Sequence, residues 1–291
     1  MNAKKALFTM ELLGIFLCSC PLYAQDEVLD LSSGWRFSAG YALGYADYSE
    51  YGNVFVVESD WRGWNSTINL KAETRMGPMI PYARIRLFKT ENGVEEWIRD
   101  GRLTQINDMK IVGGDFSLGV STSPFDFYGV NVTPRLGIIS RFQDFERKNF
   151  ALIDESRRAI FGRAESVNEL VQTYGFGGGL LLQYFFSPKW LLAGDTEVYG
   201  LFFSTAENDF FDAKINGNSG LFGSSGIFSE SSVMLVRILK NPQHRIGIRL
   251  NADLQWIEGG TSGSDFRNDI VEWPENRLRN LALDVYWRGT F

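Results

Sequence analysis

The chain has 291 residues, a formal net charge of −6 and an aromatic content of 14%. This acidic balance argues against the basic face by which nucleic-acid-binding proteins recognise phosphates, so we expect no nucleic-acid partner. With 44% hydrophobic residues and 30 glycines, the composition suits a soluble domain or a membrane barrel, in which only alternate residues face lipid.

The first 24 residues have the parts of a secretory signal peptide. Lys4 and Lys5 give a positive start, an apolar stretch covers residues 6–22, and cleavage after Ala24 suits the small-residue rule. We therefore predict a signal peptide over 1–24 and a mature domain over 25–291. A single membrane-anchoring helix is the alternative, but the apolar stretch is short and Glu11 interrupts it.

Both cysteines of the chain, Cys18 and Cys20, lie in this first segment. Cleavage after Ala24 removes them, so we expect neither a disulfide framework nor thiol catalysis in the mature domain. A second interpretation stays open, because the sequence around Cys20 resembles a lipoprotein signal in which that cysteine is lipidated. Lipidation would change the anchor and leave the rest of the chain unaffected.

Beyond residue 24 the apolar residues recur with a period of two, which is typical of strands. In the clearest segment, 246–256, apolar residues alternate with polar residues or glycine over eleven positions. Soluble strands average roughly five or six residues, whereas a tilted strand that crosses a membrane needs roughly nine to eleven. Ten segments are predicted as strands: 35–46, 64–75, 80–89, 109–122, 130–139, 171–186, 190–203, 229–240, 246–256 and 281–288.

The connections between these segments alternate in length. Four short ones contain proline, at Pro78, Pro124, Pro188 and Pro242, and the long ones cover 47–60, 90–108, 143–170, 204–228 and 258–276. Short turns on one side and long loops on the other are the layout of a bacterial outer-membrane barrel. We predict an all-β fold: one transmembrane antiparallel up-and-down β-barrel of about ten strands, with short periplasmic turns and long extracellular loops.

A soluble β-sandwich or a lipocalin-like barrel is the alternative, because alternation alone does not tell the inner face from the outer one. Strand length, the signal peptide and the final aromatic residue, Phe291, favour the membrane version. Its lumen would then be lined by charges of both signs, which should pair because an unpaired buried charge is costly. A narrow barrel filled in this way does not suit a wide diffusion pore. The predicted lumen residues are Lys71, Glu73, Arg75, Arg84, Arg86, Arg135, Arg141, Asp195, Glu197, Arg249, Asp253, Asp284 and Arg288.

Several short segments resemble the omptins, a family of ten-stranded outer-membrane proteases. The matches are Ser59-Asp60-Trp61-Arg62 with Pro78, Arg135-Leu136-Gly137-Ile138 with Phe142-Gln143, Leu192-Ala193-Gly194 with Gly200 and Ser204, and the acidic run from Glu207 to Asp212. In layout the resemblance covers nearly the whole mature chain. It implies an outer-membrane location and lipopolysaccharide as a partner.

The resemblance also implies where a catalytic site would lie, and at those positions the chain departs from the family. Omptins activate a water between an Asp pair on one loop and an Asp–His pair on a facing loop. Where the family has Asp-x-Asp-Trp this chain has Val94-Glu95-Glu96-Trp97, with Asn208 at the Asp position and Phe210 at the His position. The single histidine, His244, follows Pro242 in a predicted periplasmic turn, about 30 Å from the long loops.

A site made of carboxylates alone therefore remains open as an alternative. Glu95, Glu96, Asp209 and Asp212 could converge above the barrel and share a proton, or bind a cation, or be ordinary solvated loop acids. We predict no confident catalytic residue, no cofactor and no metal. The expected function is a non-proteolytic omptin-like outer-membrane barrel whose long loops contact an extracellular or host protein. An omptin-type endopeptidase with a rearranged acidic site and a small outer-membrane channel or porin are the alternatives, and outer-membrane lipid is a partner in each case.

Overall fold

The computed structural model describes residues 34–52, 57–154, 164–209, 226–263 and 270–290. The signal peptide predicted over 1–24 and the lipidation alternative at Cys20 lie outside these residues. Within the described ranges, no helix is long and apolar enough to cross a membrane. The strands are β1 (Trp35–Tyr51), β2 (Val57–Thr74), β3 (Met79–Thr90), β4 (Gly93–Arg99), β5 (Arg102–Thr122), β6 (Phe125–Phe127), β7 (Val130–Leu152), β8 (Ser166–Ser187), β9 (Trp190–Asn208), β10 (Gly226–Ile238), β11 (His244–Ile257), β12 (Gly260–Gly263), β13 (Ile270–Trp273) and β14 (Glu275–Thr290).

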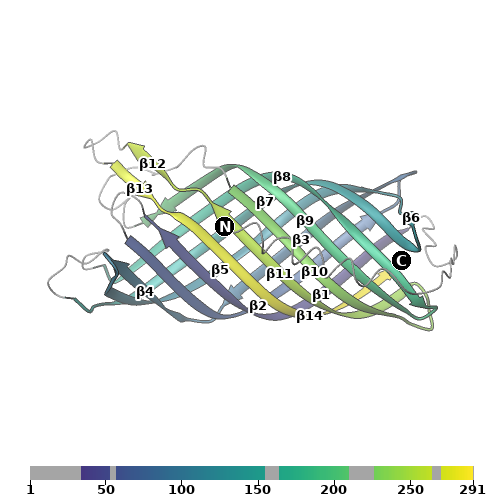
Figure 1. Cartoon of the computed structure of the whole chain (residues 1–291), viewed down its shortest axis with the longest axis horizontal. Coiled ribbons are helices and arrows are strands. Elements are labelled where there is room, and N and C mark those ends of the chain that lie inside the picture. The colour runs from purple at the N-terminus through teal and green to yellow at the C-terminus, as the bar shows by residue number, and fades with distance from the viewer. Residues whose placement is uncertain (1–33, 53–56, 155–163, 210–225, 264–269, 291) are drawn as a thin grey trace.

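These strands form a closed antiparallel barrel (Figure 1). β1 pairs with β2 on one side and with β14 on the other, so the first and last strands close the sheet. β3 and β4 both lie between β2 and β5 and together act as one interrupted strand. With β6 a short extension and β12–β13 a separate hairpin, the described residues form ten barrel strands, as the sequence predicted.

The strands are much longer than the alternation indicated. Apart from the interrupted β3–β4 strand, the barrel strands have 13 to 23 residues. The segments predicted as long loops at 47–60 and 90–108 are therefore mostly strand. In the second of these, β4 and β5 join in a tight turn at Asp100 and Gly101, whose φ angles are 51° and 70°. Positive φ at both central residues is the geometry of a two-residue hairpin turn, and it favours glycine at the second position.

The side chains on the outer surface explain why alternation in the sequence did not predict the full length of the strands. On β1 the outward side chains are exposed and mostly apolar from Trp35 to Tyr45, and then Asp47 follows. On β7 the outward apolar residues Leu136, Ile138 and Phe142 are followed by outward Asp144. The apolar belt marks the membrane-spanning part of the barrel. Above it the strands continue with polar residues on their outer face, where water replaces lipid, so the period-two signal disappears.

The inside of the barrel contains an apolar layer that the sequence analysis did not predict. Fourteen buried side chains pack together there, and aromatic residues from five strands dominate: Tyr48, Trp61, Phe145, Tyr199 and Phe228, each at most 1% exposed. The Tyr48 and Phe145 rings lie 4.8 Å apart, and Trp61 donates a hydrogen bond to the Met109 carbonyl at 3.1 Å. This layer fills the upper barrel and separates a charged cluster near the mouth from an ionic network below.

The ionic network of the lower barrel confirms the predicted pairing of lumen charges. Arg86 lies 2.7 Å from Asp115 and 2.8 Å from Asp253, and Arg135 lies 2.8 Å from Asp195. The predicted lumen position was wrong for one residue, Arg75. It lies exposed in the turn after β2, where its Nε donates to the Gly77 carbonyl at 3.1 Å, because the strand ends one residue earlier.

Candidate functional site

Above the apolar layer a single buried arginine, Arg147 of β7, binds three carboxylates. Its Nε lies 2.9 Å from Glu95 of β4, its Nη1 lies 3.0 Å from Glu169 of β8, and its Nη2 lies 2.6 Å from Glu50 of β1. The Arg147 and Glu95 side chains are both 0% exposed. We call these four residues the mouth cluster. Its three acids against one base leave a formal surplus of negative charge.

Neighbouring polar side chains hold the carboxylates of the mouth cluster in place. Ser59 donates to Oε1 of Glu95 at 3.0 Å, and Asn107 donates to its Oε2 at 2.9 Å. Tyr48 donates to Glu50 at 2.5 Å, and Asn208 donates to Glu169 at 3.1 Å. The long strands cause this convergence, since they carry inward positions from β1, β2, β4, β5, β7, β8 and β9 to one level above the apolar belt.

Burial changes the proton affinity of the mouth cluster. It raises the pKa of Glu169 to about 7; Arg147 opposes this shift, and the nearby Glu50 and Glu95 carboxylates add to it. Burial also raises the pKa of Glu50, against the opposing effect of Arg147. A protein relieves surplus buried charge by keeping one acid neutral, because an uncompensated carboxylate in a dry site is costly.

The structure separates the acids that the sequence analysis proposed as a site. Glu95 lies inside the barrel in the mouth cluster, whereas Glu96 is exposed on the outer face of the same strand. Asp209 is also exposed, and it accepts hydrogen bonds from the backbone and side-chain nitrogens of Asn168, each at 2.8 Å. Asp212 lies outside the described residues, as does Phe210. The described members of the proposed set therefore do not converge.

The sequence analysis missed three members of the mouth cluster: Glu50, Arg147 and Glu169. On β7 the inward residues Phe145 and Arg147 alternate with outward Asp144, Glu146 and Lys148, so both faces are polar near Arg147 and the pattern looked like a loop. One signal was present. The Phe142–Lys148 stretch continues the register of the predicted strand 130–139 without a glycine or proline to end it.

His244 begins β11 on the far side of the apolar layer from the mouth cluster, at the end of the barrel where β14 finishes. Its ring stacks on Trp287, with 5.7 Å between ring centres, and it is half-buried. We predicted a solvated turn residue, and the structure places it in a strand with an aromatic neighbour. Among the described residues no group of three or more His, Cys, Asp or Glu side chains is arranged to hold a metal ion.

The outward apolar belt, the closed antiparallel sheet and the packed charged interior define a bacterial outer-membrane β-barrel. Its fold is omptin-like. The chain matches the crystal structure of the outer membrane protease OmpT from Escherichia coli with a TM-score of 0.65 and 12% sequence identity, over 91% of this chain and 100% of that one. At this identity the match shows the fold alone.

Two other outer-membrane structures match over most of the chain with lower scores. The translocator domain of the autotransporter NalP from Neisseria meningitidis has a TM-score of 0.38 and 11% identity, over 99% of this chain and 98% of that one. A major outer membrane protein from Thermus thermophilus has a TM-score of 0.35 and 15% identity, over 88% and 99%. No family model and no curated protein matches the chain.

Proposed function

We propose that this chain is a non-proteolytic omptin-like barrel of the outer membrane whose extracellular end binds a partner outside the cell. The observation that carries the proposal is the mouth cluster. Of the residues that the omptin resemblance aligns with catalytic positions, Asn208 is engaged there, because it donates to Glu169. Glu96, aligned with the second Asp, is exposed on the outer face, and Glu95, which a gap in the alignment would place at the first Asp, is engaged in buried polar contacts.

Such a cluster is poorly suited to activate water. A general base needs a free lone pair within hydrogen-bond reach of the proton that it removes. Both oxygens of Glu95 already accept hydrogen bonds, from Ser59, Asn107 and Arg147, and the side chain is 0% exposed. The single histidine lies at the other end of the barrel.

The extracellular end instead offers a surface built on long strands. Strands such as β2, β7 and β8 extend well above the apolar belt, and the β12–β13 hairpin lies at the end of the barrel opposite β6 (Figure 1). Polar side chains face outward there, among them Glu58, Asp60, Glu96, Glu146 and Asn168. An extracellular or host protein is the proposed partner of this end, and lipopolysaccharide and membrane lipid are the proposed partners of the belt.

A peptide-cleavage assay tests the non-proteolytic part of the proposal. The refolded full chain is incubated with a peptide library that contains basic residues, from pH 4 to 9, beside OmpT refolded in the same way. We expect no cleavage by this chain. Cleavage that disappears in the Glu96→Ala variant would overturn the proposal.

The binding part needs cells that display the barrel. Bacteria expressing the full chain are compared, for adherence to an epithelial cell layer, with bacteria expressing a chain that lacks residues 260–273. We expect adherence to fall when the hairpin is removed while the barrel keeps its heat-modifiable mobility. Equal adherence of both strains and of a strain without the barrel would contradict a role in attachment.

One observation favours a second function, an endopeptidase with an acidic site. A carboxyl with a pKa of about 7, as for Glu169, is in the range of a general base near neutral pH. The same peptide assay separates the two functions. If this alternative holds, the chain cleaves peptides and Glu169→Gln abolishes the activity, whereas inactivity at every pH removes the alternative.

The porin alternative is disfavoured by the apolar layer, since buried aromatic rings from five strands occupy the lumen. We expect a planar lipid bilayer that contains the refolded chain to stay electrically silent. Stable single-channel steps would contradict this expectation and move the proposal to a channel.

A further inference from the structure

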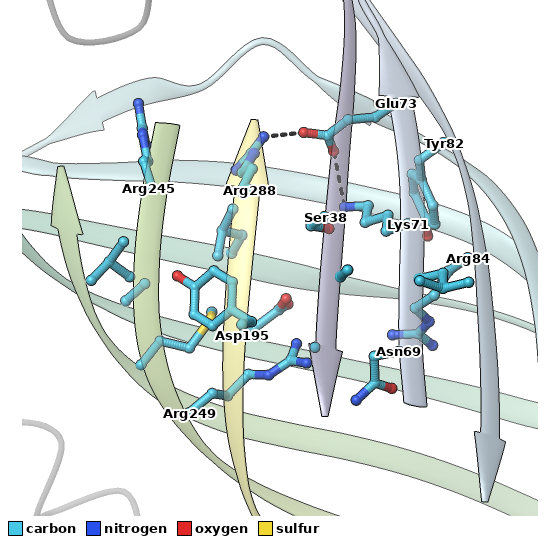
Figure 2. A pocket seen from close by; sticks show the side chains of 18 of the residues that line it. Ser38, Asn69, Lys71, Glu73, Tyr82, Arg84, Asp195, Arg245, Arg249 and Arg288 are labelled. Atoms are coloured by element: carbon cyan, nitrogen blue, oxygen red, sulfur yellow. Dashed lines mark hydrogen bonds and ion pairs between the residues drawn. The ribbon is translucent and has the colours of Figure 1, made fainter. Parts of the chain in front are cut away.

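A small cavity lies inside the barrel where the apolar layer meets the ionic network. Phe228 of the apolar layer lines one part of it, and Asp253 of the ionic network lines another. A larger cavity of about 100 Å³ lies nearer the periplasmic end, where Glu73 pairs with Lys71 and Arg288 (Figure 2). The small cavity has a volume of about 20 Å³, which is room for one water molecule.

The guanidinium of Arg141 on β7 forms part of the wall of the small cavity. Its Cζ lies 3.8 Å from the centre of the Phe228 ring, and the side chain is only 3% exposed. A cation over a ring still has N–H groups to satisfy. Asp115 Oδ2 lies 3.8 Å from Nη1, which is too far for a hydrogen bond. Asp115 therefore balances the charge of Arg141 without accepting a hydrogen bond from this N–H group.

Other buried polar atoms in the same wall also lack a hydrogen-bond partner within the described parts of the chain. They belong to β2 and β11, which border the cavity together with β7. Nearly all buried polar groups in proteins have a partner, because an unmade hydrogen bond is costly. The atoms are Nε and Nη1 of Arg141, Oγ1 of Thr67, Oδ1 of Asn65, Oδ1 of Asp253 and Oε1 of Gln255. Their position around one cavity indicates a shared partner.

Hydrogen bonds to other atoms hold two of these side chains in place. Asp253 accepts at its Oδ2 from Arg86 at 2.8 Å, and Gln255 donates from its Nε2 to Gln143 at 2.7 Å. The second oxygen of each group cannot turn to a new protein partner without breaking these bonds. The cavity therefore keeps both acceptors beside the donors of Arg141.

We propose that this cavity binds one water molecule, which accepts from Arg141 and donates to Asp253. A guanidinium only donates hydrogen bonds and a carboxylate only accepts them, so a partner for both must do each, as water does. A halide ion would be repelled by Asp253 and a metal cation by Arg141, and the volume excludes a larger ligand. The bound water lets the ionic network lie directly against the aromatic rings.

The test is nuclear magnetic resonance of the refolded, ¹⁵N-labelled full chain in deuterated detergent micelles. We expect a rotating-frame Overhauser cross-peak between water and the Nε proton of Arg141, with the sign of dipolar contact and not of proton exchange. Arg147 is the matched control, because it is also a buried arginine of β7 but its Nε donates to Glu95 at 2.9 Å. Its Nε proton should give no such cross-peak. Arg141→Lys and Arg147→Lys each remove one resonance and so assign the two.

Three variants locate the water. Thr67→Val removes a hydroxyl that could relay a signal from bulk water, and the cross-peak should persist. Ala46→Val adds two methyl groups to the wall of the cavity and should abolish the cross-peak. Ala252→Val adds the same groups on the exposed outer face of β11 and should leave it unchanged. Heat-modifiable mobility in electrophoresis verifies that each variant is folded, and the unmodified chain and Thr67→Val decide the question if Ala46→Val does not fold.

Crystals of the refolded chain soaked in bromide separate water from a halide ion. Anomalous scattering from bromide in the small cavity would replace the water by a halide and overturn the proposal, whereas its absence there supports water. The proposal is also overturned if Arg141 gives no cross-peak, if Arg141 and Arg147 give equal cross-peaks, if Thr67→Val abolishes the signal, or if folded Ala46→Val keeps it as Ala252→Val does.

Discussion

The mouth cluster and the group of charges around Glu73 are charge inverses of each other within one barrel. At the mouth one base, Arg147, contacts the three acids Glu50, Glu95 and Glu169. Near the periplasmic end one acid, Glu73, contacts the three bases Arg36, Lys71 and Arg288. The first has negative charge in surplus and the second has positive charge in surplus, and the apolar layer separates them.

What distinguishes the two regions is access of water. Arg147 and Glu95 are 0% exposed. Burial raises the pKa of Glu169, so the mouth cluster relieves its surplus of negative charge by keeping a proton on this carboxyl. The bases around Glu73 keep 14% to 25% of their side chains exposed, and two of them, Lys71 and Arg288, border a cavity. Water and mobile ions can screen a surplus of charge there. The same imbalance of charge therefore gives a fixed brace in a dry place and a screened group of ions in a wet one.

The largest effect should come from removing the central base of the dry region. Arg147→Met leaves three carboxylates buried without their cation, and breaking such a buried arrangement costs roughly 3–5 kcal/mol. We expect the free energy of unfolding to fall by that amount, measured by urea denaturation of the barrel in detergent micelles. Replacing Glu50, Glu95 and Glu169 by Gln in the same variant should recover part of the loss.

The neighbouring residue on β7 supplies the control for this variant. Lys148 is outward-facing, and its side chain is 52% exposed in a pair with Glu146. Lys148→Met should change the stability by no more than about 0.5 kcal/mol. If Arg147→Met and Lys148→Met destabilise the barrel equally, the mouth cluster does not brace the fold.

A smaller effect is expected from pH. Glu169 has its pKa raised from 4.5 to about 7 in the folded barrel, so between these values the folded state keeps a proton that the unfolded chain has released. Stability is therefore full below about pH 4.5 and falls as the pH rises through 7, by roughly 1–3 kcal/mol. Glu50 acts in the same direction because its pKa is also raised. Urea midpoints measured from pH 4 to 8 would show the decline.

Substitution of one acid isolates its share of this pH dependence. Glu169→Gln keeps the shape of the side chain and the hydrogen bond from Arg147 or Asn208, and it removes the titrating proton. We expect its stability to vary less with pH between 4.5 and 7 than that of the unmodified chain. A profile with the original slope would mean that another group titrates in this window.

Alternation in the sequence predicted the strand segments whose outer face contacts lipid. In that belt most outward residues are apolar and the inward residues are mostly polar, so segments such as 35–46 and 246–256 were read correctly. The same rule fails above the belt, where Asp144 and Lys148 face water, and it hid the ends of β1, β7 and β8. Strand extent there depends on pairing with neighbours far along the chain, which a single sequence does not display.

The sequence predicted that charges would pair inside the barrel, but it did not predict which side chains would lie together there. Charge pairing followed from the narrow barrel, and pairs such as Arg86 with Asp115 confirm it. The inward aromatic residues were not predicted: Phe228 fell in the segment 204–228 that was read as a loop, and Tyr199, two residues after Glu197, was not singled out among the lumen residues. For Glu95 and Glu96, adjacent positions in one strand lie on opposite faces, so two acids that look like a pair in the sequence share no site.

The smallest predicted change in stability concerns the partly exposed charges around Glu73. It would be the sharpest test of the contrast with the buried mouth cluster. Glu73→Gln removes the acid that three cations share, but water and mobile anions can replace its charge. We expect a loss of only about 1–2 kcal/mol in chloride buffer, between the values for exposed and for buried pairs. The measurement is the urea midpoint of the refolded chain at low and at high ionic strength, with Arg147→Met as the comparison. Salt should reduce the loss for Glu73→Gln and leave the loss for Arg147→Met unchanged, because mobile ions reach only the exposed group. If Glu73→Gln were as damaging as Arg147→Met and indifferent to salt, the two regions would be braces of the same kind, and access of water would not be what separates them.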